Sequence, residues 1–246
     1  MTESLTKTPL RLILVVLISA LIGAGAFAVL QRAIPGVSAD RAAMERVVHD
    51  YVLEHPEILP EAMDRLREKE TAQVVAANRE AIVDPFAGAW EGAKDPKATV
   101  VVYMDYACGF CRASLPEIDK LVKGDPGVRV VYRELPILSA QSETAAQWSL
   151  AAAEQGKFEK FHDTLFAADR LTEDAIRHAA RVAGLDMDRA AQFAGSQEAA
   201  RQIAQNLSMA RQLGVTGTPA WVIGNRVTSG ALPYQQLQAQ IEHAKS

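Results

Sequence analysis

The sequence predicts an α/β fold, and three observations support that class. Residues 99–104 and 128–134 are short runs rich in β-branched residues, which is typical of strands buried on both faces. Apolar residues at helical spacing lie between them, so the unit reads as a strand–helix–strand crossover and a parallel sheet is expected. Residues 140–213 are alanine-rich and helically periodic, and strand-like patterns return after Gly214.

The first expected element is an apolar segment. Residues 12–30 contain one polar side chain, Ser19, and positive charges flank the run on both sides. This pattern is typical of a membrane-targeting segment. Small residues at 24–28 match a signal-peptide cleavage site, whereas the length nearly reaches the ~20 residues that span a bilayer. Residues 1–32 are therefore expected to be a signal peptide or an N-terminal membrane anchor.

A helical N-terminal arm is expected over residues 38–83. Its first helix has a wide apolar stripe at helical spacing, formed by Met44, Val47, Val48, Tyr51 and Val52. That helix should end before Pro56, because a residue preceding proline is driven out of the helical region. The second helix, about 61–82, has a thin apolar stripe and dense charges. The arm is either a solvated spacer or an oligomerisation arm, and the wide first stripe favours burial between copies of the chain.

Residues 97–139 are expected to form the first half of the central domain. The helix after the first strand should begin near Cys108, be kinked by Pro116 and end at Gly124. A right-handed crossover places Cys108 and Cys111 at the carboxyl end of the first strand, where open α/β sheets carry their active sites.

The rest of the chain is expected to insert a helical domain and then complete the sheet. Residues 140–206 should form several packed helices, one of which starts at Thr172 and stops at Gly184. Residues 207–246 should complete the central domain with a hairpin at 220–228 and a last helix.

Composition and charge exclude some partners. The chain has 246 residues, 49% of them hydrophobic, and a formal net charge of -4, with Lys and Arg scattered among Asp and Glu. Without a basic patch, no nucleic-acid partner is expected. The five histidines are spread over different predicted helices without the spacing of metal ligands, so packing or surface roles are expected for them.

The predicted chemistry depends on the two cysteines, Cys108 and Cys111, which form one Cys-x-x-Cys motif. The loop between them is too short to restrain the unfolded chain, so the pair is chemical rather than structural. The positive end of the helix favours the thiolate of Cys108, which would attack, while the shielded Cys111 would resolve the mixed disulfide. We expect a redox-active Cys108–Cys111 disulfide and no cofactor.

Two further observations refine this hypothesis: the identity of the residues between the cysteines, and the metals that the two thiols could bind. Gly109 and Phe110 carry no charge or side-chain donor, so this dipeptide does not indicate a very strong oxidant. A closed zinc site needs four ligands, and the sequence has no second cysteine pair. Two soft thiolates do suit Cu(I), so a Cu(I) site at Cys108 and Cys111 stays open as an alternative.

Four segments together resemble a known family. They are 101–112 (VVYMDYACGFCR), 130–138 (VVYRELPIL), 155–162 (QGKFEKFH) and 214–219 (GVTGTP). In combination they resemble the DsbA-type thioredoxin-like proteins, especially the suppressor-of-copper-sensitivity C and Com1-like branch, over about residues 40–243. The resemblance implies a thioredoxin-like fold with an inserted helical domain. It also implies a location in the bacterial periplasm, either soluble after signal cleavage or tethered to the inner membrane by 12–30.

The resemblance implies site roles as well. It implies a cis peptide bond before Pro219 that faces the cysteines, and a substrate platform at Thr218, whose backbone would pair with bound substrate. One position departs from the pattern, because thioredoxin and DsbA carry a buried acid six residues before the first cysteine and Val102 stands there in this chain. Asp105 or Glu134 would then move protons for the second cysteine, and Asp105 could equally cap the active-site helix.

The leading functional hypothesis is a thiol-disulfide oxidoreductase acting on unfolded or misdisulfided exported proteins, with a membrane redox partner. Oxidase, isomerase and reductase activities stay open. A homo-oligomer assembled through 38–83 would suit isomerisation, whereas a monomer would suit oxidation or reduction. The alternative is a Cu(I)-binding envelope protein of copper tolerance with little catalysis.

Overall fold

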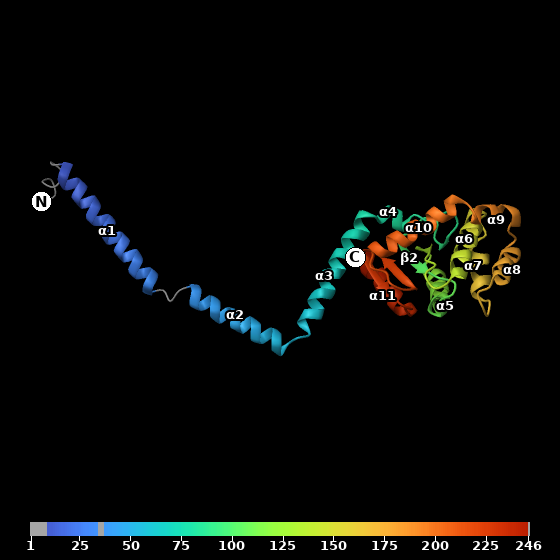
Figure 1. Ribbon diagram of the computed structural model, residues 1–246, viewed down its shortest axis with the longest axis horizontal. Helices are drawn as coiled ribbons and strands as arrows, with labels where there is room; N and C mark the ends of the chain where they lie inside the picture. The colour runs from blue at the N-terminus through green and yellow to red at the C-terminus, as the bar shows by residue number, and fades with distance from the viewer. Residues whose placement is uncertain (1–8, 34–36, 246) are drawn as a thin grey trace. The chain divides into compact units, whose positions relative to one another are not determined.

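The structure is a computed structural model that describes residues 9–33 and 37–245. The chain divides into two compact units, Met1–Asp64 and Arg65–Ser246 (Figure 1). All strands found in the described residues belong to the second unit.

The first unit is helical. It contains α1 (Pro9–Ala33), α2 (Val37–Glu54) and the start of α3 (Ile58–Ala77). Helix α2 ends directly before His55 and Pro56, as predicted. Its apolar stripe is exposed within this unit, at Met44, Val47, Val48 and Tyr51.

The apolar residues 12–30 lie within α1. Among the described residues, no helix combines the length and the apolar character that crossing a membrane requires. Both alternatives for residues 1–32, a cleaved signal peptide and an N-terminal membrane anchor, stay predictions.

The predicted helix at 61–82 is interrupted. Helix α3 ends at Ala77 and a short helix, α4 (Arg79–Val83), follows Asn78, whose backbone leaves the helical region at φ -118° and ψ 19°. The Asn78 side chain donates a hydrogen bond of 2.9 Å to the carbonyl of Val74, which competes with the helical hydrogen-bond pattern. The break lets Val75 and Ile82 both become buried, so this end of the arm packs better than its charges suggested.

A mixed five-stranded sheet forms the centre of the second unit, in the order β1-β3-β2-β4-β5. The strands are β1 (Trp90–Gly92), β2 (Ala98–Met104), β3 (Val128–Glu134), β4 (Ala220–Ile223) and β5 (Arg226–Ser229). The expectation of a parallel sheet holds for β2 and β3 alone, since the other three pairings are antiparallel. β1 was not predicted, because three residues carry no measurable periodicity.

Helices cover both faces of the sheet, which explains why β2 is apolar along its whole length. On one face, Val100 and Val102 pack with residues of α5 (Gly109–Gly124) and α11 (Tyr234–Lys245). On the opposite face, Val101 and Tyr103 pack with the end of α3, with α4 and with α10 (Gln197–Gln212). These are called the α5 face and the α10 face below.

The helical block contains α6 (Ala140–Glu154), α7 (Phe158–Phe166), α8 (Glu173–Ala183) and α9 (Met187–Ala194), followed by α10. Thr172 caps α8 by accepting a hydrogen bond from the Ala175 amide, and Gly184 ends it in the left-handed conformation, so both predicted helix limits are confirmed. Helix α10 runs without a break across the predicted boundary at 206–207, and the predicted domain limits stay predictions.

Candidate active site

The two cysteines lie where β2 leads into α5. Residues 105–107 form the turn after β2, and Cys108 is the N-cap residue of α5, with an extended backbone at φ -85° and ψ 116°. Cys111 lies one turn further along the helix. Cys108 therefore occupies the position where the first amide groups of a helix have no partner within that helix.

The loop before β4 completes the site. The Cys108 thiol donates a hydrogen bond of 3.2 Å to the carbonyl oxygen of Thr218, and the Thr218–Pro219 peptide bond is cis. Antiparallel pairing of β2 with β4, which sets Tyr103 opposite Ala220, brings this loop to the cysteines. The structure thus brings together Cys108, Cys111, Thr218 and Pro219.

Both cysteines are free thiols in this structure, and both are buried. Cys108 is 8% exposed and Cys111 is 0% exposed. Cys108 is therefore less open than the exposed nucleophile expected from the sequence, while Cys111 is as shielded as expected.

Burial raises the pKa of the Cys111 thiol far above its ordinary value. A backbone hydrogen bond involving Asp105 and the hydroxyl of Thr218 act in the opposite direction without outweighing burial. The Thr218 Oγ1 is itself buried and has no well-formed hydrogen bond among the described residues. Cys111 is thus held as a neutral thiol until a neighbouring group or a reaction step changes its surroundings.

Asp105 does not cap the active-site helix. One carboxylate oxygen accepts a hydrogen bond of 2.8 Å from the Ala107 amide. The other accepts from the amides of Ile137 and Leu138, at 2.9 and 3.0 Å. The capping alternative is therefore wrong, and Asp105 instead joins the cysteine turn to the loop after β3.

Glu134 lies at the end of β3 within a buried polar network. Its Oε1 accepts a hydrogen bond of 2.6 Å from Ser149 Oγ, which lies 2.8 Å from the Tyr106 hydroxyl. Burial raises the pKa of Glu134 to about 8, so the group is mostly protonated at neutral pH. Among the described residues, the groups that shift the pKa of Cys111 do not include Glu134.

His162 is part of the same network, and sequence reasoning gave it only a packing or surface role. Its Nδ1 lies 2.9 Å from the Tyr106 hydroxyl, and its ring contacts those of Tyr132, Phe158 and Phe166. Burial lowers the pKa of His162 to about 3, so the ring is neutral. The packing role is correct, and the hydrogen bond to the cysteine turn could not be read from the sequence.

Exposed apolar side chains lie near the cysteines. Phe110, between them, is 69% exposed, and Ile137 and Leu138 are 43% and 53% exposed. The hydrogen bonds to Asp105 hold the backbone of Ile137 and Leu138 beside the cysteine turn. Sequence reasoning missed these two residues as site residues, although they lie in the segment 130–138 that carried the family resemblance.

Metal ligands are sparse around the thiols. Within the part of the chain that the structure describes, no group of three or more His, Cys, Asp or Glu side chains is arranged to hold a metal ion. Cys108 and Cys111 could supply two sulfur ligands, a number that suits Cu(I) better than a closed zinc site.

Comparison with known proteins agrees with this geometry. Residues 99–242 match the DSBA-like thioredoxin domain, and residues 40–73 match the N-terminal domain of the copper resistance protein ScsC. A thioredoxin-like oxidoreductase from Silicibacter pomeroyi is 37% identical, with a TM-score of 0.65, over 68% of this chain and 98% of that chain. A periplasmic thioredoxin-like protein from Salmonella enterica serovar Typhimurium is 30% identical, with a TM-score of 0.61, over 68% of this chain and 95% of that chain.

A curated relative is much longer than this chain. The Na(+)/H(+) antiporter NhaA 3 of Salinispora tropica is 34% identical over 166 residues, which are 66% of this chain and 25% of the antiporter. The chain thus spans about a quarter of the length of the curated relatives it matches. The solved relatives confirm the thioredoxin-like fold with its helical insertion. Since the domain match covers more than half of the sequence, the chain belongs to the family of DsbA-like thioredoxin-domain proteins, with an N-terminal region of the ScsC type.

Proposed function

We propose that this protein is a thiol-disulfide oxidoreductase in which Cys108 attacks and Cys111 resolves. The observation that carries the proposal is the asymmetry of the pair. Cys108 occupies the N-cap of α5 and contacts the Thr218 carbonyl, whereas Cys111 is fully buried with a strongly raised pKa. In such a pair, one sulfur attacks the client disulfide and the other resolves the mixed disulfide.

With these roles, reduction of a client disulfide proceeds in two steps. The Cys108 thiolate attacks one sulfur of a client disulfide, forming a mixed disulfide and releasing one client thiolate. The Cys111 thiol then loses its proton and attacks the Cys108 sulfur. The products are the Cys108–Cys111 disulfide and a second client thiolate, so the client gains two electrons and the enzyme loses two. Oxidation of a client dithiol is the reverse sequence.

A proton acceptor for Cys111 is part of this mechanism, and the site does not favour the two acids considered from the sequence. Asp105 is committed to three backbone amides. Glu134 is mostly protonated at neutral pH and is hydrogen-bonded to Ser149. The departing client thiolate, released next to the pair, is the acceptor that the mechanism itself supplies.

We assign the clients to unfolded or misdisulfided exported proteins in the bacterial periplasm. The apolar surface at Phe110, Ile137 and Leu138 supports clients with exposed apolar chain. The apolar segment 12–30 and the periplasmic Salmonella relative support the compartment. A membrane redox partner would return the pair to its starting state, and assembly through 38–83 would favour isomerase over oxidase activity.

The proposal is tested with Cys108→Ala and Cys111→Ala, using insulin reduction and refolding of scrambled ribonuclease. Cys108→Ala should lose both activities. Cys111→Ala should accumulate a mixed disulfide with the client, visible as a mass increase that disappears on reduction. Full activity of Cys108→Ala, or no trapped intermediate with Cys111→Ala, contradicts the assigned roles.

A second candidate function is Cu(I) binding, which the match of 40–73 to a copper resistance protein's N-terminal domain favours. The two thiols would provide the ligands. Competition with a chromogenic Cu(I) chelator distinguishes the candidates. Tight binding that Cys108→Ala abolishes, together with negligible insulin reduction by the intact protein, would replace the oxidoreductase proposal.

A further inference from the structure

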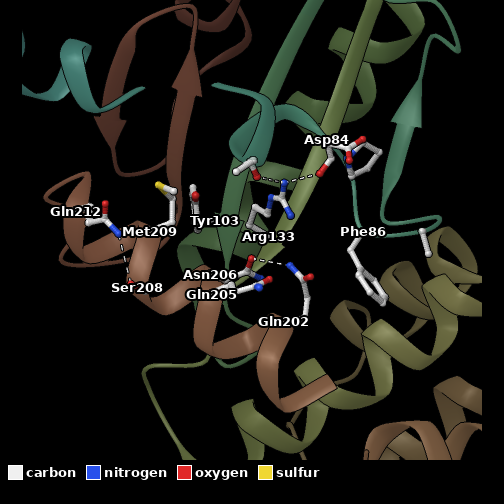
Figure 2. A pocket seen from close by; sticks show the side chains of 13 residues that line it. Asp84, Phe86, Tyr103, Arg133, Gln202, Gln205, Asn206, Ser208, Met209 and Gln212 are labelled. Carbon is white, nitrogen blue, oxygen red and sulfur yellow. Dashed lines mark hydrogen bonds between the residues drawn. The ribbon is translucent and has the colours of Figure 1, made fainter. Parts of the chain in front are cut away.

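A cavity of about 500 Å³ lies on the α10 face, away from the cysteines (Figure 2). Its floor is formed by Tyr103 of β2 and Arg133 of β3, which are directly paired across the parallel strands. One wall is α10, with Gln202, Gln205 and Asn206. The cysteines pack in the cluster on the other face, so the cavity is separate from the candidate active site.

Arg133 is a buried cation that opens to this cavity. The residue is 6% exposed, and its Nη2 donates to the carbonyls of Ala81, Ile82 and Asp84 at 2.7, 3.0 and 2.5 Å. Within the described chain, its Nε and Nη1 have no hydrogen-bond partner. Neither atom is one of the completely buried polar atoms that lack a partner. Figure 2 shows the guanidinium between Asp84 and the amides of α10. The free donors therefore face the cavity.

Tyr103 and Gln205 add further unused hydrogen-bonding groups. Tyr103, which is 1% exposed, lines the cavity next to Arg133 across the strand pair, and its hydroxyl has no hydrogen bond within the described residues. The amide of Gln205 is exposed and makes no side-chain hydrogen bond within the described residues. By contrast, Asn206 donates to the Glu134 carbonyl and accepts from Gln202, so both the nitrogen and the oxygen of its amide already have partners. A guanidinium and a hydroxyl with free donors form a suitable clamp for a carboxylate.

Charge and polarity differ between the floor and the rim. Asp84 is exposed and lines the cavity, so a carboxylate lies at its mouth and a cation at its floor. Phe86 and Met209 also line the cavity and supply apolar surface on opposite sides of these charges (Figure 2). The cavity volume lies within the range of small-molecule sites. A ligand that satisfies all three features carries a carboxylate, an ammonium group and an apolar side chain.

We propose that this cavity binds a free α-amino acid, with its carboxylate on Arg133 and Tyr103 and its ammonium group on Asp84. Gln205 would hydrogen-bond the ligand from α10. Phe86 would contact an apolar side chain. The site is independent of disulfide exchange at Cys108.

Titration calorimetry of the full chain with four probes tests the proposal. L-leucine should bind, L-leucinamide should lose at least about tenfold in affinity because it lacks the carboxylate, and N-acetyl-L-leucine should be weakened because it lacks the ammonium group. Leu-Leu should bind more weakly than leucine, because neither of its residues carries both a free carboxylate and a free ammonium group. Binding of the dipeptide tighter than leucine contradicts the proposal.

Variants tie the binding to the cavity. Asp84→Asn should abolish the difference between leucine and N-acetyl-leucine, and Gln205→Leu should weaken leucine binding without changing insulin reduction. Gln197→Leu, on the exposed start of the same helix, is the matched control and should bind like wild type. Arg133 also supports α4, so Tyr103→Phe serves as the milder floor variant. Absence of leucine binding, equal binding of leucine and leucinamide, or unchanged binding in Gln205→Leu and Tyr103→Phe overturns the proposal.

Discussion

The Cys108 thiol donates a 3.2 Å hydrogen bond to the carbonyl oxygen of Thr218, 110 residues further along the chain. The sheet creates this contact, because β4 begins directly after Pro219 and pairs with β2 directly before the cysteine turn. The Cys108 sulfur and the loop opposite it are therefore positioned by two neighbouring strands rather than by flexible connections. Variants of Thr218 should consequently act on the chemistry as well as on stability.

Thr218→Val should raise stability and slow the resolving step. The buried Thr218 hydroxyl has no well-formed hydrogen bond among the described residues, so an isosteric valine removes an unsatisfied group and should stabilise the second unit by about 1 kcal/mol. The same hydroxyl lowers the pKa of Cys111, so its loss should slow release of the mixed disulfide. Urea unfolding and stopped-flow release of a fluorescent mixed disulfide measure the two effects.

Thr228→Val is the control for the predicted effects of Thr218→Val on stability and on the resolving step. The Thr228 hydroxyl does have a partner, Gln240 Oε1 at 3.3 Å, so its replacement should lower stability and leave the resolving step unchanged. Equal stability changes in the two variants would contradict the prediction.

The pH dependence of stability should change sign across the neutral range. The pKa of Glu134 rises from 4.5 to about 8 on folding, so the folded chain binds more protons and stability falls as pH rises through that interval. The pKa of His162 falls from 6.5 to about 3, so stability falls as pH drops from 6.5 to 3. The two contributions oppose each other between pH 4.5 and 6.5. Above pH 6.5 stability continues to fall, because Glu91, whose pKa burial raises to about 7, adds to Glu134 up to that pH. The Glu134 contribution is at most about 1.4 kcal/mol per pH unit.

Glu134→Gln isolates this effect. Glutamine keeps an oxygen that can accept from Ser149 but cannot ionise. The difference in unfolding free energy between wild type and variant should change between pH 4.5 and 8 and be constant outside that interval. Glu91 also has a pKa raised by burial, to about 7, and its contribution cancels in the difference. A flat difference for Glu134→Gln would contradict its buried, protonated state.

Asp105→Ala should release the loop after β3. The variant removes acceptors for three backbone amides, which should cost about 1–3 kcal/mol and accelerate hydrogen exchange at Ile137 and Leu138. Asp125→Ala is the matched control, since Asp125 accepts from the Gly127 amide in a similar turn elsewhere in the domain. Unchanged exchange at 137 and 138 would show that Asp105 does not hold the loop.

The proposed assembly through 38–83 predicts a solution mass above that of one chain. Deleting 38–64, the part of the arm in the first unit, should give the monomer mass while keeping the buried Val75 and Ile82. Val48→Glu should shift the mass toward it because the side chain lies in the exposed apolar stripe of α2. His49→Glu adds the same charge next to that stripe but on a different side of the helix, and should leave the mass unchanged. A monomeric wild-type chain in sedimentation equilibrium would refute assembly.

Local patterns predicted much of the fold. The ends of α8 at Thr172 and Gly184 follow from the chemistry of helix caps, and the uniform apolar character of β2 follows from burial on both faces. The break at Asn78 was not predicted, because the charged residues before it continue a helical pattern. β1 was missed because it is stabilised by pairing with β3 rather than by its own three residues.

The residues of the candidate site also fall into those that the sequence predicted and those that it did not. The motif identified the cysteines, and the family resemblance identified Thr218 and Pro219. The partners of Asp105 lie more than 30 residues away, and Arg133 obtains its neighbours from α4 and α10. Such roles depend on which segments meet in space, so they could not be predicted from spacing along the chain.

The ends of the sheet have a consequence for the proposed function. One edge is β1, with three residues, and the other is β5, with four, so each offers few free backbone groups to another chain. Short edge strands give an extended segment little template for adding to a sheet. Under the proposed function, a client with exposed β-prone sequence would therefore meet the thiols without nucleating a shared aggregate along the sheet edges.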